Sequence, residues 1–118
     1  MKGWTDWNIL LDENGGPNHV SNFCFAPIIA DTKTGEVYYT NIYYYIGQFS
    51  KFIKPGAKRI IGASNRDVLQ TTAFKNPDGK IVVIVLNTTD KPMSYKLWMG
   101  GTAAEANSLP HSIMTLLF

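Results

Sequence analysis

The sequence predicts a mainly β fold, an antiparallel β-sandwich or barrel that follows a segment with one helix. Three observations predict it. Residues 53–118 hold several short β-prone runs separated by turn signals. Residues 81–86 are a β-branched run typical of a central strand buried on both faces. Residues 40–52 carry apolar side chains at helical spacing.

Residues 53–118 are predicted to be successive strands. We expect them at 58–63, 68–74, 81–86, 94–98, 104–109 and 113–118. Residues 76–79, Asn-Pro-Asp-Gly, predict a tight turn because proline presets φ and glycine accepts φ > 0. Residues 87–92, Gly100-Gly101 and Pro110 mark the later turns. This spacing of strands and turns favours hairpins in an antiparallel arrangement.

Residues 1–52 are more irregular. The pattern predicts a strand at 4–11, a loop at 12–27, a short strand at 28–30 and a turn at 31–35, with 37–39 pairing back across it. Thr40 or Asn41 is expected to cap a helix that runs to about Phe52. A loop of about 16 residues is long for a compact domain and is usually functional or disordered. We therefore expect this half to need a scaffold from elsewhere.

Composition narrows the classes of function. The 118 residues match the size of one domain. The net charge of +2, without a long basic run, argues against a nucleic-acid partner. No apolar run approaches the ~20 residues that span a bilayer, so no transmembrane segment is predicted. The first residues lack the apolar stretch of a signal peptide, so a secreted protein would carry its signal upstream of Met1.

Trp7 is the main candidate for ligand binding. It lies in a cluster, residues 4–8 (Trp-Thr-Asp-Trp-Asn), at the end of the predicted first strand. A tryptophan there is either part of a core or a platform on which the C–H face of a sugar ring stacks. Because buried aromatic rings are the commoner case, these residues alone favour the core.

The sequence predicts no catalytic residue, metal site or cofactor. Asp12 and Glu13 are the one adjacent pair of carboxylates, but neighbours normally point apart, so a solvated loop is favoured over a glycosidase pair. His19 and His111 lack the partner spacing of metal ligands. Cys24, the single cysteine, cannot form an internal disulfide and is expected to be a small buried hydrophobe.

Two other patterns have ordinary explanations. Residues 87–89, Asn-Thr-Thr, match an N-glycosylation acceptor, but the turn expected there explains them. Tyrosines at 38–39 and 43–45 are either a ligand platform or packing residues whose phenol tips reach partners, and packing is favoured.

With these residues placed, the chain resembles the C-terminal part of glycoside hydrolase family 30, the glucosylceramidase-like enzymes. The matching segments, in the family's order, are residues 3–8 (Gly-Trp-Thr-Asp-Trp-Asn), 15–18 (Gly-Gly-Pro-Asn), 26–29 (Ala-Pro-Ile-Ile), 44–53, 76–79, 82–87 and 110–113 (Pro-His-Ser-Ile). They cover nearly the whole chain. The pattern departs at Phe25, where the family usually has aspartate, and at Gln48, where it usually has histidine.

The resemblance implies a layout and a mechanism. Residues 1–52 would be the last strand, active-site loop and last helix of a (β/α)₈ barrel, and residues 53–118 a β-sandwich domain. Trp7, and less directly Asn22 in the loop, would bind substrate, because active sites of such barrels form at the C-terminal ends of strands. The family's two catalytic glutamates lie on earlier strands, so this piece would have no catalytic residue.

Two hypotheses follow. In the first, the parent protein is a retaining β-glycosidase for a β-glycoside or glucosylceramide-like substrate, and the chain supplies one wall of the pocket and packs against the rest of the barrel. In the second, it is a stand-alone, non-catalytic β-sandwich module that binds sugar or is structural. Titration with glucosides, with and without Trp7→Ala, discriminates between them. The isolated chain is expected to be inactive and, with its first strand unpaired, to self-associate or alter its N-terminal part.

Overall fold

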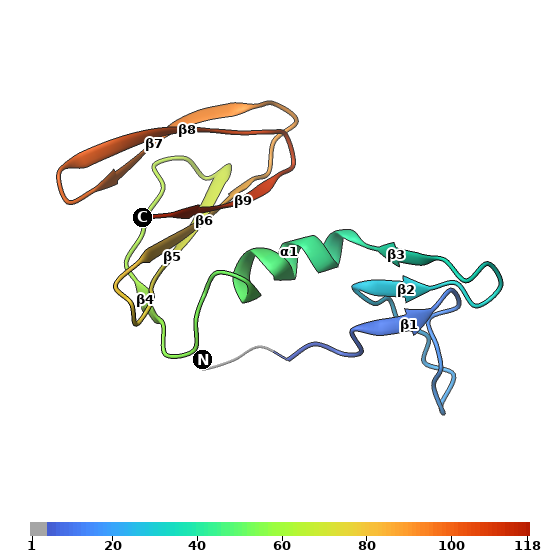
Figure 1. The fold of residues 1–118 in the computed structure, drawn as a ribbon. Helices are drawn as coiled ribbons and strands as arrows, with labels where there is room; N and C mark the ends of the chain where they lie inside the picture. The colour runs from blue at the N-terminus through green and yellow to red at the C-terminus, as the bar shows by residue number, and fades with distance from the viewer. Residues whose placement is uncertain (1–4) are drawn as a thin grey trace. The chain divides into compact units, whose positions relative to one another are not determined.

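The structure is a computed structural model that describes residues 5–118. It confirms a mainly β fold with one helix. In chain order the elements are β1 (Leu10–Asp12), β2 (Ile28–Ala30), β3 (Val37–Tyr39), α1 (Asn41–Ser50), β4 (Lys58–Ile60), β5 (Leu69–Lys75), β6 (Ile81–Asn87), β7 (Met93–Met99), β8 (Thr102–Ser108) and β9 (Ile113–Leu117) (Figure 1). The chain divides into two compact units, one ending at Gly47 and the other running from Gln48 to Phe118.

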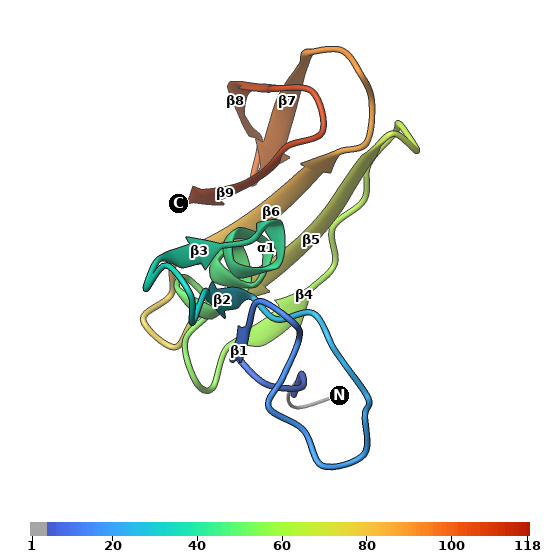
Figure 2. The ribbon, with the colours of Figure 1, turned by 90° about the vertical axis from the view of Figure 1, so that its right-hand side faces the viewer.

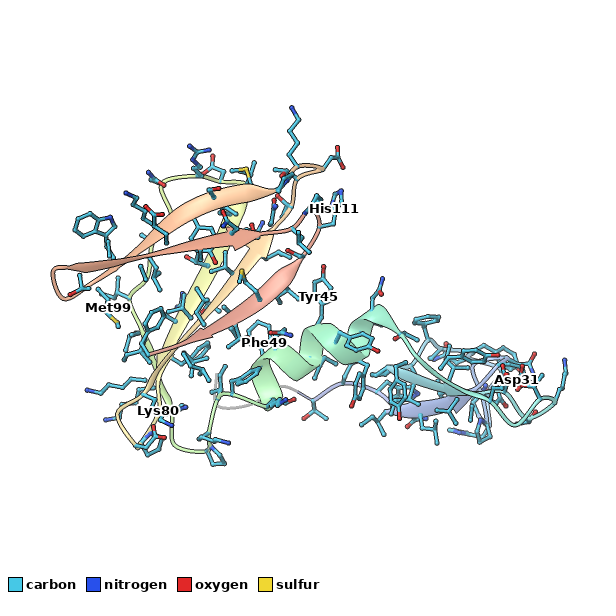
Figure 3. The ribbon with its side chains drawn as sticks, turned by 45° about the horizontal axis from the view of Figure 1, so that its top comes forward. Asp31, Tyr45, Phe49, Lys80, Met99 and His111 are labelled. Atoms are coloured by element: carbon cyan, nitrogen blue, oxygen red, sulfur yellow. The ribbon has the colours of Figure 1, made fainter. Side chains whose placement is uncertain are left out.

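The first unit contains a three-stranded sheet in the order β1-β2-β3. β1 runs parallel to β2, and β3 runs antiparallel to β2, which confirms the predicted pairing of residues 37–39 across a turn. Asp31, labelled in Figure 3, closes this turn: its carboxylate accepts the N–H groups of Lys33 at 2.8 Å and Thr34 at 3.1 Å. These two hydrogen bonds hold the pKa of Asp31 below its ordinary value.

The first strand is shorter than the sequence predicted. Of the expected strand at 4–11, Trp4 lies outside the described residues and residues 5–9 are not in a strand, while β1 begins at Leu10. The N–H of Ile28, the first residue of β2, donates to the carbonyl of Ile9 at 3.0 Å, so the ladder between the two strands begins there.

The helix forms nearly as predicted, but Thr40 does not cap it with its side chain. α1 ends at Ser50, two residues before the expected Phe52. The Thr40 hydroxyl instead donates to the carbonyls of Ala26 at 3.2 Å and Pro27 at 3.1 Å. Thr40 therefore fastens the end of the long loop to the start of the helix.

The second unit is a sandwich rather than a closed barrel. Its four-stranded antiparallel sheet has the order β4-β5-β6-β9, and the separate β7–β8 ribbon lies over one face (Figures 1 and 2). The core between them contains Leu69, Ala73, Val83 and Val85. Side chains from β7 and β9 pack against this cluster, namely Met93, Tyr95, Leu97, Met114 and Leu116.

β6 is buried on both faces, as its β-branched sequence predicted. Val83 and Val85 face the sandwich core, while Val82 and Ile84 on the opposite face are also buried. Thr115 of β9 pairs with Ile84 and donates to the side-chain oxygen of Gln48 at 2.7 Å. The last turn of α1 therefore lies over this second face of the sheet.

Two buried asparagines fix the turns of the second unit. Asn76 accepts the N–H of Lys54 at 3.0 Å and donates to the carbonyl of Phe52 at 2.9 Å, so the β5–β6 turn holds the segment after α1. These two hydrogen bonds fix the main chain next to residues 52–53. The domain boundary expected there stays a prediction.

Asn87, at the end of β6, is fully buried and makes hydrogen bonds through both ends of its amide. Its nitrogen donates to the carbonyls of Lys91 at 2.8 Å and Leu109 at 2.9 Å. Its oxygen accepts the N–H of Thr89 at 2.9 Å and the Thr89 hydroxyl at 2.8 Å. The side-chain nitrogen of Asn87, to which a glycan would be attached, is therefore buried and already donates both of its hydrogen bonds within the protein.

Candidate functional site

Asp12 fixes the base of the long loop that follows β1. One oxygen of its carboxylate accepts the N–H groups of Asn14 at 2.9 Å and Gly16 at 2.8 Å. Its own N–H donates to the carbonyl of Gly16 at 2.7 Å. The last residue of β1 thus folds the beginning of the loop back onto the end of the strand.

Gly15 lets the two ends of the loop meet, main chain against main chain. Its carbonyl accepts the N–H of Cys24 at 3.1 Å. Gly15 has φ +81°, and a Cβ on it would lie 2.3 Å from the Cys24 carbonyl oxygen. Any side chain would therefore displace the loop, which explains the glycine at this position.

Glu13 ties the start of the loop to the β2–β3 turn. Its carboxylate accepts the N–H of Thr32 at 3.0 Å and the Thr32 hydroxyl at 3.1 Å. These bonds, the backbone one above all, lower the pKa of Glu13. Its side chain is 19% exposed, so these hydrogen bonds shield it partly from water. A hydrogen-bond partner 19 residues away in sequence leaves no local pattern to reveal it.

The loop encloses a shallow, open depression on the first unit. The residues that line it are Asp12, Asn14, Gly16, Pro17, Asn18 and Phe23. A carboxylate, two amides and one aromatic ring are groups that hold a polyhydroxylated ligand through hydrogen bonds and stacking. The resemblance implied that this segment is an active-site loop and included residues 15–18, Gly-Gly-Pro-Asn, but the substrate-binding residue it named within the loop was Asn22.

The two predicted substrate-binding residues are exposed. Trp7 precedes β1, is 67% exposed and donates its main-chain N–H to the Asp6 carboxylate at 2.9 Å. Asn22 is an exposed loop residue whose N–H donates to the Asn18 side chain at 3.1 Å. Neither lines the depression, and no hydrogen bond joins them in the described part of the chain. Because Trp7 is exposed, no other described residue of the first unit covers its indole ring, and a ligand can stack on it.

Across residues 5–118 no three His, Cys, Asp or Glu side chains gather as a metal site. Cys24 is a half-buried free thiol within the loop. No helix in the described residues has the length and apolar character needed to cross a bilayer.

Two family profiles match the chain in succession. The glycosyl hydrolase family 30 TIM-barrel domain matches residues 1–53, and the glycosyl hydrolase family 30 beta sandwich domain matches residues 56–116. The chain belongs to glycoside hydrolase family 30. This confirms the resemblance and the order of its parts, the end of a barrel followed by a sandwich. The first profile includes the long loop that follows β1, and the second includes the β4-β5-β6-β9 sheet.

Relatives in family 30 include glucosylceramidases. Lysosomal acid glucosylceramidase of Mus musculus is 46% identical over 92 residues, which are 77% of this chain and 18% of the mouse protein. Putative glucosylceramidase 1 of Caenorhabditis elegans is 39% identical over 125 residues, covering 100% of this chain and 24% of that protein. The chain therefore spans only about a fifth to a quarter of these relatives.

A solved structure shares the fold of this family 30 chain. The crystal structure of SrfJ from Salmonella typhimurium superposes with a TM-score of 0.91 at 34% identity, covering 96% of this chain and 25% of that one. The endo-beta1,6-glucanase BT3312 shares the fold, with a TM-score of 0.83 at 24% identity, 92% of this chain and 25% of that one.

Proposed function

We propose that the chain is the C-terminal part of a retaining β-glycosidase that cleaves glucosylceramide-like β-glucosides. It supplies one wall of the sugar pocket and the supporting sandwich, and the rest of the barrel supplies the catalytic glutamates. The observation that supports this most is the ordered match to the barrel and sandwich profiles over residues 1–53 and 56–116.

The partners of the chain's own glutamates support this division of labour. Glu13 accepts from Thr32, Glu36 from the Tyr38 hydroxyl, and Glu105 pairs with Lys96 at 3.1 Å. A retaining glycosidase needs two carboxyl groups about 5–5.5 Å apart across the scissile bond. Each glutamate here is instead engaged by a near neighbour in the fold, so the reacting pair is assigned to the remainder of the barrel.

The first unit has the features of a pocket wall. Trp7 presents an open indole face beside the strand, Asp12 holds the start of the following loop, and Glu13 ties that start to the β2–β3 turn. An aromatic ring stacks on the C–H face of a sugar, and a fixed loop binds at lower cost in conformational entropy than a mobile one. These residues therefore suit substrate positioning rather than bond cleavage.

A chimera tests the proposal. This chain replaces the matching C-terminal segment of the mouse relative, and hydrolysis of a fluorogenic β-glucoside is measured. We expect the chimera to be active and the 118-residue chain alone to be inactive. Trp7→Ala should lower kcat/KM about tenfold or more, which corresponds to a loss of at least ~1.4 kcal/mol of transition-state stabilisation. Trp7→Phe should lose less, because it keeps an aromatic face.

Trp98→Ala serves as the matched control, since Trp98 is equally exposed but lies in the second unit, on β7. It should leave hydrolysis of the small glucoside unchanged. A correctly folded chimera without activity, or turnover by the isolated chain, would contradict the proposal.

A further inference from the structure

The β7–β8 ribbon has one face committed to the core and another that nothing in its own unit uses. Side chains alternate along a strand, so β7 sends Met93, Tyr95 and Leu97 against the core cluster. The Tyr95 hydroxyl also donates to the sulfur of Met114 in β9 at 3.1 Å. These contacts fix which way the ribbon faces, and the remaining side chains of β7 therefore point outward.

Three cross-strand pairs make up this outer face. In the antiparallel register they are Trp98 with Ala103, Lys96 with Glu105, and Ser94 with Asn107. All six residues are exposed. Trp98 is 70% exposed, and its neighbour across the ribbon is a small alanine that leaves the indole face open.

The pairs hold each other in place as one row. Lys96 and Glu105 form an ion pair at 3.1 Å, and Ser94 donates to the side-chain oxygen of Asn107 at 2.6 Å. Residues two apart on a strand are separated by about 7 Å, so the row extends roughly 14 Å from Trp98 to Ser94. Gly100 and Gly101, both at positive φ, make the two-residue turn that keeps the strands in this register.

We propose that this outer face is a second, non-catalytic carbohydrate-binding site that takes a linear, glucose-like oligosaccharide. One ring stacks on Trp98, and the next rings bind the Lys96–Glu105 and Ser94–Asn107 pairs. Pyranose rings with equatorial hydroxyls present a flat C–H face to an indole and a rim of donors and acceptors to polar groups. The face itself is argued independently of the proposed function, which enters only in the choice of a glucose-like sugar.

The charge and polarity of the face favour a neutral sugar over other occupants. Lys96 and Glu105 cancel, so the face has no net charge to attract anionic lipid or a charged partner. The ion pair lies in the middle of the row, with its side chains 60% and 77% exposed, whereas the centre of a protein interface is depleted of charge. Met99 follows Trp98 in sequence and points the other way, so the two do not form an apolar patch for a membrane.

The test is calorimetric titration of the 118-residue chain with cellohexaose, a linear hexamer of β-linked glucose. We expect a Kd of about 1 mM or tighter. Trp98→Ala should weaken binding at least tenfold, and Trp98→Tyr should retain most of it. The urea unfolding midpoint of Trp98→Ala should equal that of the wild type, because the side chain is exposed.

Other outcomes overturn the proposal. They are absence of cellohexaose binding, equal binding by Trp98→Ala, and binding that depends on Trp7 instead. Sedimentation with neutral phosphatidylcholine vesicles but no sugar binding would assign the face to lipid. Loss of a wild-type dimer in Trp98→Ala would assign it to a second copy of the chain. Failure here leaves the proposed function untouched, because the chimera assay uses a small glucoside and depends on Trp7.

Discussion

Removal of the Asn87 side chain should be among the most destabilising single changes in the sandwich. The amide makes four hydrogen bonds and is fully buried. At a net ~1 kcal/mol for each bond, Asn87→Ala would lose about 4 kcal/mol. Thr89 and the two carbonyl partners belong to residues that are not buried, so part of this is regained from water. We therefore expect the free energy of unfolding to fall by about 2–4 kcal/mol.

Urea denaturation followed by circular dichroism measures this loss. With a slope of about 1–3 kcal/mol per molar urea, the unfolding midpoint should fall by roughly 0.7–4 M. Asn87→Asp keeps an oxygen for the Thr89 N–H but turns a second oxygen toward the carbonyls of Lys91 and Leu109. It should therefore be no more stable than Asn87→Ala at pH 7.

Asn107→Ala is the matched control for this prediction, because Asn107 is an exposed asparagine on β8. It should change the free energy of unfolding by about 0.5 kcal/mol or less. A loss below about 1 kcal/mol in Asn87→Ala, or an Asn87→Asp variant as stable as the wild type, would refute the view that this amide organises the turns.

Three further changes probe the loop and the first strand. Hydrogen bonds from Thr32 lower the pKa of Glu13. The carboxylate therefore contributes to stability above its ordinary pKa of 4.5, and this contribution is lost as the pH falls through the lower pKa of the folded state. Protection of the Thr32 N–H from hydrogen exchange should therefore persist at pH 4.5 and disappear only in more acidic solution. Glu13→Gln should show no such pH-dependent transition. Loss of this protection in the wild type at pH 5 or above would contradict the prediction. Gly15→Ala should lower the free energy of unfolding by about 1–3 kcal/mol and speed amide exchange at Cys24. Gly35→Ala is the control: Gly35 has φ +75° but open space around it, so this change should cost only the ~1 kcal/mol of left-handed strain. Equal costs for the two variants would argue against the main-chain contact at Gly15. The chain should self-associate through the outer edge of β1, and Ile9→Lys, at an exposed position beside that edge, should shift it toward monomer in light scattering; a wild type that is monomeric at high concentration would refute this.

The sandwich was predictable because its signals are local. The β-branched run at residues 81–86 gave β6, and residues 76–79 gave the β5–β6 turn. Gly100-Gly101 marked the β7–β8 turn, since two residues at positive φ strongly favour glycine. Period and turn chemistry are properties of neighbouring residues, so a single sequence displays them.

The loop and its fastenings were not predictable in the same way. Glu13 binds Thr32, and Asn76 binds the main chain of Phe52, across 19 and 24 residues. A polar residue that will be buried by a distant partner has the same local sequence as one that stays in water. The first strand was overestimated because alternation suggested residues 4–11, whereas its partner β2 begins only at Ile28, which pairs with Leu10.

The central position of β6 also has a consequence for protein quality control. Residues 81–86 are uncharged, rich in β-branched side chains and free of proline and glycine, the composition of segments that stack into amyloid-like fibrils. In the folded chain β5 and β9 pair with the two edges of β6, so β6 has no free edge at which another chain could pair. A stop codon before Ile113 would remove β9 and leave a long, flat, hydrophobic strand open to intermolecular pairing. Truncation before Ile113 should therefore produce insoluble protein rather than merely less stable protein.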